Sequence, residues 1–172
     1  MLEELYGNWN IPCNIDPSDD VSSIEILTFS DNGYSVHSAQ YSDSNCIDLD
    51  LEVRLNGSIN YAGNKVISAG QTVNMITIQI NSEQFSIRLK DETLIDIYNS
   101  RSTCGRTDWG NNTYKNVSDC DELGSLSDTF DESVKDIYFL DGNQLYFGSD
   151  QSELDENGFP SALKDGYVTK KQ

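Results

Sequence analysis

Hydrophobic and polar residues alternate with a period of two along most of the chain. The clearest case is the segment 48–55, DLDLEVRL, in which every second residue is aliphatic and the residues between are charged. Successive side chains of a β-strand point to opposite faces, so this alternation predicts a strand with one buried and one solvated face. The pattern contains no long amphipathic helix and no βαβ unit, and it therefore predicts an all-β protein.

Turn-forming residues separate the alternating segments and predict hairpins. The predicted turns are Asp31-Asn32-Gly33, Asn56-Gly57, Asn81-Ser82-Glu83 and Asp141-Gly142-Asn143. They join the predicted strands 23–29 and 34–41, 49–55 and 58–61, 73–80 and 85–89, and 136–140 and 144–147. The segments 5–11, 93–98 and 167–169 complete roughly ten short strands.

Residues 100–133 break the alternation, because they are rich in Ser, Asn, Asp and Gly. We expect at most one or two short helices there: one at 118–123 before Gly124, and one from the helical spacing of Leu126, Phe130 and Val134. No linker divides the chain, so we predict a single β domain over residues 1–172. Consecutive hairpins favour an antiparallel up-and-down meander that closes into a barrel, with a β-sandwich as the alternative.

The charge of the chain narrows the choice of partners. Among 172 residues there are 29 Asp and Glu against 11 Lys and Arg, a net charge of −18. This balance argues against nucleic acid and against anionic lipid surfaces as partners. The first basic residue is Arg54, so the chain contains no positively charged signal segment. No run approaches the ~20 apolar residues of a membrane span, and we expect no transmembrane segment and a monomer.

Four cysteines, Cys13, Cys46, Cys104 and Cys120, indicate an oxidising compartment. They form no Cys-x-x-Cys pair, so two disulfides are a better interpretation than a zinc site. Of the three possible connectivities, the sequence-local one pairs Cys13 with Cys46 and Cys104 with Cys120. We therefore expect a protein of the periplasm, the cell surface or the extracellular space.

Near the N-terminus, Gly7-Asn8-Trp9 resembles the Gly-x-Trp signature of lipocalins, in which the Trp plugs one end of a barrel. A wider likeness joins this motif to Cys13, Leu27-Thr28-Phe29, Gly33-Tyr34 and the segment 41–46, YSDSNC. Later parts of the same likeness are Cys104-Gly105, Trp109, Cys120, Leu145-Tyr146-Phe147-Gly148 and Gly158-Phe159-Pro160. In spacing and residue type, most of residues 5–168 is similar to bacterial lipocalin-like lipoproteins and to the adenomatous polyposis coli down-regulated secreted family.

This resemblance implies a lipocalin-like β-barrel, a Cys13–Cys46 disulfide and no catalytic residues. It further implies ligand binding or interaction with an extracellular protein. The chain departs from animal lipocalins in two respects: it has no Thr-Asp-Tyr segment, and no late Arg that packs on the Trp.

Catalytic and metal-binding signals are weak in the sequence. His37 is the only histidine, and alternation directs it away from the face of Tyr34, Val36 and Ser38. Asp96 is expected on the outward face of the 93–98 strand. Paired acids such as Asp48 and Asp50 leave calcium as a weaker alternative, and the segment 153–164 imitates an EF-hand loop but has Lys in the last position. We predict no enzymatic activity, no cofactor and no metal site.

The function expected from these observations is binding of a small apolar ligand inside the barrel. Eight residues are directed inward by alternation and are the candidate lining of the ligand site: Tyr34, Val36, Leu51, Val53, Ile76, Ile78, Phe85 and Ile87. A filled core is an equal interpretation of the same residues. The alternative function is an extracellular interaction or adhesion domain that uses its acidic face or the loop around Trp109.

A fatty acid is not the expected ligand, because its carboxylate needs a basic partner near the cavity. The four arginines are Arg54, Arg88, Arg101 and Arg106. Alternation directs Arg54 and Arg88 outward, and only Arg101 and Arg106, in the irregular region, remain free to reach a cavity mouth. The sequence therefore favours an uncharged or cationic apolar ligand.

Overall fold

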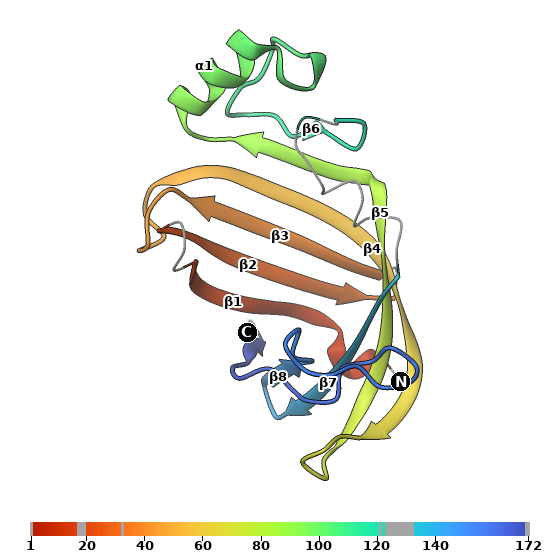
Figure 1. Ribbon diagram of the computed structural model, residues 1–172. Coiled ribbons are helices and arrows are strands. Elements are labelled where there is room, and N and C mark those ends of the chain that lie inside the picture. Colours follow the sequence, from red (N-terminus) through yellow and green to blue (C-terminus); the bar gives the residue numbers. More distant parts are fainter. Residues whose placement is uncertain (1, 17–19, 32, 121, 123–132, 171–172) are drawn as a thin grey trace.

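Eight antiparallel strands close into a β-barrel in the computed structural model, which describes residues 2–16, 20–31, 33–120, 122 and 133–170 (Figure 1). The barrel strands are β1 (Gly7–Asp16), β2 (Val21–Ser30), β3 (Gly33–Tyr41), β4 (Leu49–Val66), β5 (Thr72–Leu89), β7 (Val134–Asp141), β8 (Gln144–Phe147) and β9 (Val168–Lys170). Each strand pairs with the next, and the barrel closes where Trp9 of β1 lies opposite Lys170 of β9. The predicted all-β, up-and-down barrel is confirmed, and the β-sandwich alternative is wrong.

The short strand β6 (Lys115–Asn116) lies outside this ring. It pairs with the second half of β5, at Ser86 and Ile87, whereas β7 pairs with the first half of β5. The part of the barrel that holds β7, β8 and β9 is therefore closed by main-chain hydrogen bonds. At the other end, β1 continues beyond its last partner in β9.

Two of the predicted turns are wrong, because β4 and β5 are continuous strands of 18 residues each. Asn56-Gly57 lies within β4, where Gly57 is opposite both Tyr34 and Ile80. A Cβ atom on Gly57 would lie 2.3 Å from the carbonyl oxygen of Gln79. The glycine therefore permits a close approach of strands and not a reversal of the chain. The second predicted turn, Asn81-Ser82-Glu83, lies within β5 in the same way.

The predicted strand 93–98 is also wrong, because these residues form the helix α1 (Glu92–Arg101). Asp91 caps the helix: its side chain accepts a hydrogen bond of 2.8 Å from the backbone N–H of Leu94. Leu94, Ile95 and Tyr98 share one side of the helix and pack against a cluster that includes Trp109. The N-cap and the packing of α1 thus outweigh the strand tendency of the short apolar run. Asp96 therefore lies on a helix and not on the outward face of a strand.

Both helices predicted in residues 100–133 extend into residues outside those that the structure describes. Ser118 to Cys120 form a turn and a coil, and Val134 begins β7. The described residues otherwise contain two short 3-10 turns, η1 (Glu3–Leu5) and η2 (Thr103–Gly105). The strand predicted at 5–11 begins two residues later, because η1 occupies its start.

Trp9 is buried in the part of the barrel that holds β7, β8 and β9, which we call the closed end, and its role as a plug of that end stays a prediction. Its side chain is 1% exposed and packs in a cluster with Leu5, Leu27 and Phe29. The indole Nε1 donates a hydrogen bond of 2.6 Å to the carbonyl oxygen of Leu5. Lys170 lies over the ring, with Nζ at 5.2 Å from its centroid. The sequence has no late Arg to pack on the Trp, as animal lipocalins have, but Lys170 takes up this position over Trp9.

Both disulfides join the cysteines that the sequence pairs locally. Cys13–Cys46 links β1 to the loop between β3 and β4, and Cys104–Cys120 links η2 to the segment after β6. The second disulfide lies in the cluster of Phe85, Leu89 and Trp109. The described residues contain no free cysteine.

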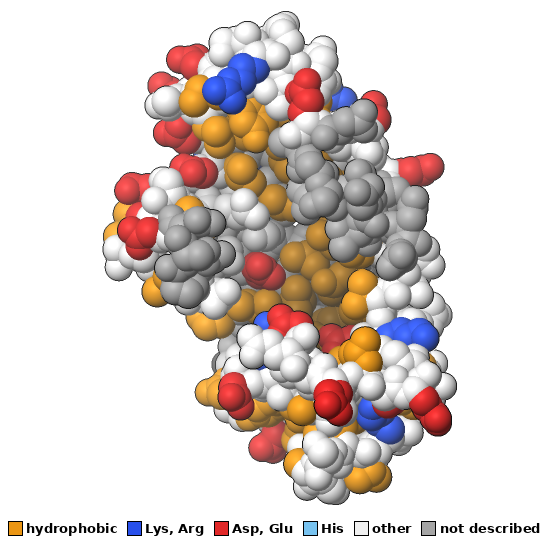
Figure 2. All heavy atoms as spheres, in the orientation of Figure 1, with side chains coloured by type: hydrophobic (Ala, Val, Ile, Leu, Met, Phe, Trp, Pro, Cys, Tyr) orange, Lys and Arg blue, Asp and Glu red, His pale blue; other side chains and the backbone are white. Residues whose placement is uncertain are grey.

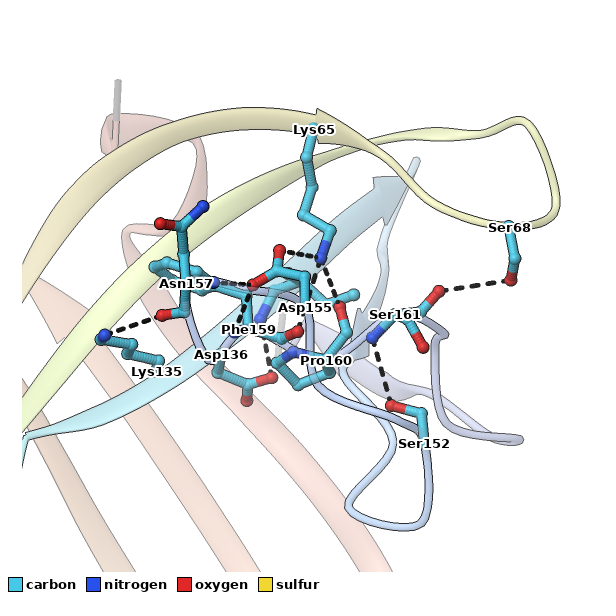
Figure 3. Close-up of polar contacts among 11 residues, drawn as sticks. Lys65, Ser68, Lys135, Asp136, Ser152, Asp155, Asn157, Phe159, Pro160 and Ser161 are labelled. Carbon is cyan, nitrogen blue, oxygen red and sulfur yellow. Dashed lines mark hydrogen bonds and ion pairs between the residues drawn. The ribbon is translucent and has the colours of Figure 1, made fainter.

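A segment between β8 and β9 covers the outer face of β5 and β7. Its Phe159 packs against Val73 and Ile137 in a separate cluster. The Asp155 carboxylate holds the segment in place by accepting a hydrogen bond of 2.6 Å from Lys65 Nζ and one of 2.9 Å from the Phe159 N–H (Figure 3). These bonds lower the pKa of Asp155 to about 2.

Candidate functional site

The strand register arranges the inward side chains of β1 to β4 in rows. The row beside the closed end is apolar and consists of Trp9, Leu27, Val36 and Leu55. The next row consists of Ile11, Glu25, Ser38 and Val53, and the third contains Ser23, Gln40 and Leu51. On β2 and β3 the interior therefore becomes polar with distance from the closed end, and Glu25 is the charged residue in these rows.

A cavity of about 460 Å³ opens between β1, β2, β7, β8 and the connection to β9. Its apolar walls come from Ile11, Leu145, Phe147 and Val168. Its charged lining residues are Glu25, Asp136, Lys164 and Asp165. Figure 2 shows the molecule hollowed between the region of α1 and the region of β8, with hydrophobic side chains on the floor of the hollow. This combination can hold an apolar body and orient a polar group.

Asp136 lies in β7 and is held rigidly. Its Oδ1 accepts hydrogen bonds from the backbone N–H of Ile137, at 2.7 Å, and of Gly148, at 3.0 Å. A Cβ atom on Gly148 would lie 2.4 Å from the same oxygen, so a glycine is needed there. Burial raises the pKa of Asp136 to about 6, and the two backbone hydrogen bonds lower it by less. Its protonation therefore changes close to neutral pH.

Glu25 reaches the cavity from β2. Burial raises the pKa of this carboxyl as well, while a hydrogen bond with Ser23 and the charge of Lys164 oppose the rise. Among the described residues neither Glu25 nor Asp136 forms an ion pair, and the charge of Lys164 only partly offsets the effect of burial on their pKa values. The pKa of Tyr34 is raised by burial and then by the charges of both carboxylates. The cavity is thus lined by two carboxyls that form no ion pair with the described residues, and Lys164 is the basic residue near them.

The eight residues proposed from the sequence as ligand lining divide between two packed clusters. Tyr34, Val36, Ile76 and Ile78 belong to the cluster around Trp9. Leu51, Val53, Phe85 and Ile87 belong to the cluster under α1 and Trp109. None of the eight lines the cavity between β1 and β8. In the structure they are packed residues of the barrel wall, so their role as ligand lining stays a prediction.

Sequence reasoning missed the carboxyls of the cavity, although a signal for them exists. Glu25 alternates in phase with Leu27 and Phe29, and Asp136 with Tyr138 and Leu140. An acid that shares the phase of the buried residues of its strand faces the interior. That both carboxyls face one cavity follows only from barrel closure.

The outer face of β3, β4 and β5 carries a separate network around Tyr114. Arg54 and Arg88 lie over its ring, at 3.9 and 4.5 Å from the centroid, and its hydroxyl is 3.2 Å from His37 Nε2. Glu52 accepts a hydrogen bond from Arg88 and lies 3.5 Å from His37. The prediction that both arginines and His37 point outward is confirmed. These groups are on the opposite face of the sheet from the cavity.

The other candidate residues have structural partners. Trp109 is 4% exposed, stacks edge-on with Tyr98 and donates from Nε1 to the carbonyl oxygen of Thr103. Arg106 donates to the carbonyl oxygen of Asn116, at 2.6 Å. In the described part of the chain no group of three or more His, Cys, Asp or Glu residues is placed to hold a metal ion.

No protein-family model matches the chain, and no curated protein matches it. Within the described residues, no helix is both long and apolar enough to span a membrane.

Proposed function

We propose that the barrel is a non-enzymatic binding module that takes one small apolar molecule into the cavity between β1, β2, β7 and β8. The cavity of about 460 Å³ carries this proposal. Ligand sites in proteins are concave and mostly apolar with a few fixed polar groups, and cavities of about 300–1,000 Å³ are typical. The walls formed by Ile11, Leu145, Phe147 and Val168 would contact the apolar body of the ligand.

Rigid walls support this function. Leu145 is fully buried and Val168 is 7% exposed, and both pack in the cluster around Trp9. Pairing of β1 with β9 and of β8 with β9 fixes the walls by main-chain hydrogen bonds. A preformed site loses little conformational entropy when a ligand binds.

We place the protein outside the reducing cytoplasm, in the periplasm, on a cell surface or in the extracellular medium. The two disulfides support this location, because such bonds persist in oxidising compartments. The proposal is of a monomeric carrier or sensor of a small molecule.

The test is titration with N-phenylnaphthylamine, a neutral apolar probe whose fluorescence rises in an apolar environment. We expect saturable binding at one site. Ile11→Trp, which places a larger side chain at the cavity wall, should weaken binding about tenfold or more. The matched control is Ile15→Trp in the same strand, where the side chain is 50% exposed, and it should leave the affinity unchanged.

Absence of saturable binding would refute the proposal. That result would favour the alternative, an interaction domain with a filled barrel. Equal binding by the two variants would show that the probe occupies some other part of the molecule.

A further inference from the structure

The carboxyls of Glu25 and Asp136 approach the cavity from opposite walls of the barrel. In the closed ring, β3, β4 and β5 separate β2 from β7 on one side, and β1, β9 and β8 separate them on the other. Both side chains nevertheless line the same cavity. A ligand within the cavity would therefore lie between the two carboxyls. In an acidic patch on a surface, by contrast, both carboxyls would be on the same side of the ligand.

We propose that the cavity selects an amphiphile with a cationic head group, a protonated amine, which lies between Glu25 and Asp136. This inference rests on the proposed function of the cavity and names the chemical class of its ligand. The apolar part of the molecule contacts Ile11, Phe147 and Val168, and the ammonium group donates hydrogen bonds to the two carboxylates. Charge-assisted hydrogen bonds of this kind are the strong ones in protein sites.

The geometry of Asp136 supports a recognition role. Its hydrogen bonds with described residues, from Ile137 and Gly148, both end on Oδ1. They fix the carboxyl and leave Oδ2 without a hydrogen bond to the described residues. A fixed carboxyl in the lining of a cavity gives orientation to a ligand at little cost in entropy.

The charges around the cavity favour a cation over an anion. Lys164 is the one basic residue among its lining residues, and it is 61% exposed and paired with Asp150. Two acids on opposite walls and the nearby Asp165 outnumber it. An amine would form the ion pair that neither carboxyl makes with the described residues, whereas a carboxylate would add a further negative charge.

Three probes of equal chain length separate the possibilities: decylammonium, decanol and decanoate, each titrated by calorimetry against the unaltered protein. We expect decylammonium to bind about tenfold or more tightly than decanol, and decanoate to bind most weakly. Equal affinity for decylammonium and decanol, or tightest binding of decanoate, would overturn the inference and leave the proposed function standing. No binding of any probe would overturn both.

Substitutions then locate the head group. In the double variant Glu25→Gln, Asp136→Asn, decylammonium should bind no better than decanol, while decanol binding stays. The matched control, Glu83→Gln with Asp141→Asn, removes the same charge outside the cavity and should keep the preference for the amine. A preference that survives the cavity variant would also overturn the inference. If the double variant does not fold, the single substitutions and the probe series on the unaltered protein still decide the question.

Discussion

At the scale of single residues, the interior acids lower the stability of the protein at neutral pH. Burial of Asp136 disfavours its charged form, and no cation within ion-pair distance among the described residues compensates. The Asp136 carboxyl can lie against the backbone of Gly148 because this residue has no side chain. A residue that opposes stability and yet is carefully positioned is typical of a functional site.

The Asp136→Asn variant tests this cost. In the folded protein the pKa of Asp136 is about 6 against an ordinary 3.8, so the unfolded chain loses this proton first as the pH rises. The group therefore stabilises the fold below about pH 4, and this contribution is lost as the pH rises through about 6. The Asn oxygen can keep both backbone hydrogen bonds. We expect the variant to gain stability relative to the wild type, by up to about 3 kcal/mol, between about pH 4 and pH 7.

Denaturant unfolding at both pH values measures this difference. The control is Asp141→Asn, at the exposed end of the same strand, which should show no such pH-dependent gain. A constant difference between Asp136→Asn and wild type would contradict the raised pKa.

Trp9 is the residue on which the closed end depends. Trp9→Ala should lower the free energy of unfolding by about 3–5 kcal/mol, because a large buried ring and its hydrogen bond to Leu5 are lost. Tyr6→Ala, at a neighbouring side chain that is 36% exposed, should cost much less. A loss within about 0.5 kcal/mol for Trp9→Ala would mean that the ring does not support the barrel.

At the scale of elements, the long pair β4 and β5 links the two ends of the molecule. Their side chains contact the cluster around Trp9 at one end and the cluster under α1 at the other, and Leu55 lies against both clusters. Glycines allow these strands to pass close to their neighbours: the oxygen of Gly57 would lie 2.3 Å from a Cβ on Gly33. The strands can approach each other this closely because Gly33 and Gly57 have no side chains.

Gly57→Ala should destabilise the protein by about 2 kcal/mol or more, because the added methyl group would meet the Gln79 carbonyl at 2.3 Å. Gly110→Ala is the matched control, since a Cβ atom added there would meet no atom within 4 Å. Chemical denaturation of the two variants compares them directly. Equal stability would show that Asn56-Gly57 is a flexible turn after all.

At the scale of the whole molecule, the two disulfides fasten segments that the barrel hydrogen bonds do not hold. Cys13–Cys46 spans a sequence separation of 33 residues, and Cys104–Cys120 spans 16. Each limits the freedom of the unfolded chain. In a protein with a net charge of −18, this restraint offsets part of the repulsion between acidic side chains.

Replacement of each cysteine pair by serine should therefore reduce stability. The chain-entropy relation gives about 4 kcal/mol for Cys13–Cys46 and about 3 kcal/mol for Cys104–Cys120. Thermal or denaturant unfolding of the two double variants measures the losses. Unchanged stability of either variant would show that its disulfide closes a segment already ordered in the unfolded chain.

Local patterns in the sequence determined the faces of the alternating strands. The pairing of the cysteines was the sequence-local choice among three, and the burial of Trp9 was an expectation from the Gly-x-Trp resemblance; the structure has both. Alternation is a local property, so it predicted the outward positions of Arg54 and His37.

Tertiary structure decided what local patterns leave open. Asn-Gly signals a turn in an isolated hairpin, but the pairing of β4 along β5 kept Gly57 in a strand. Residues 93–98 became helical because Asp91 caps them and Trp109 covers them. Only closure of the ring placed Glu25 and Asp136 on one cavity, because their distance in space depends on strand order and not on the sequence near either residue.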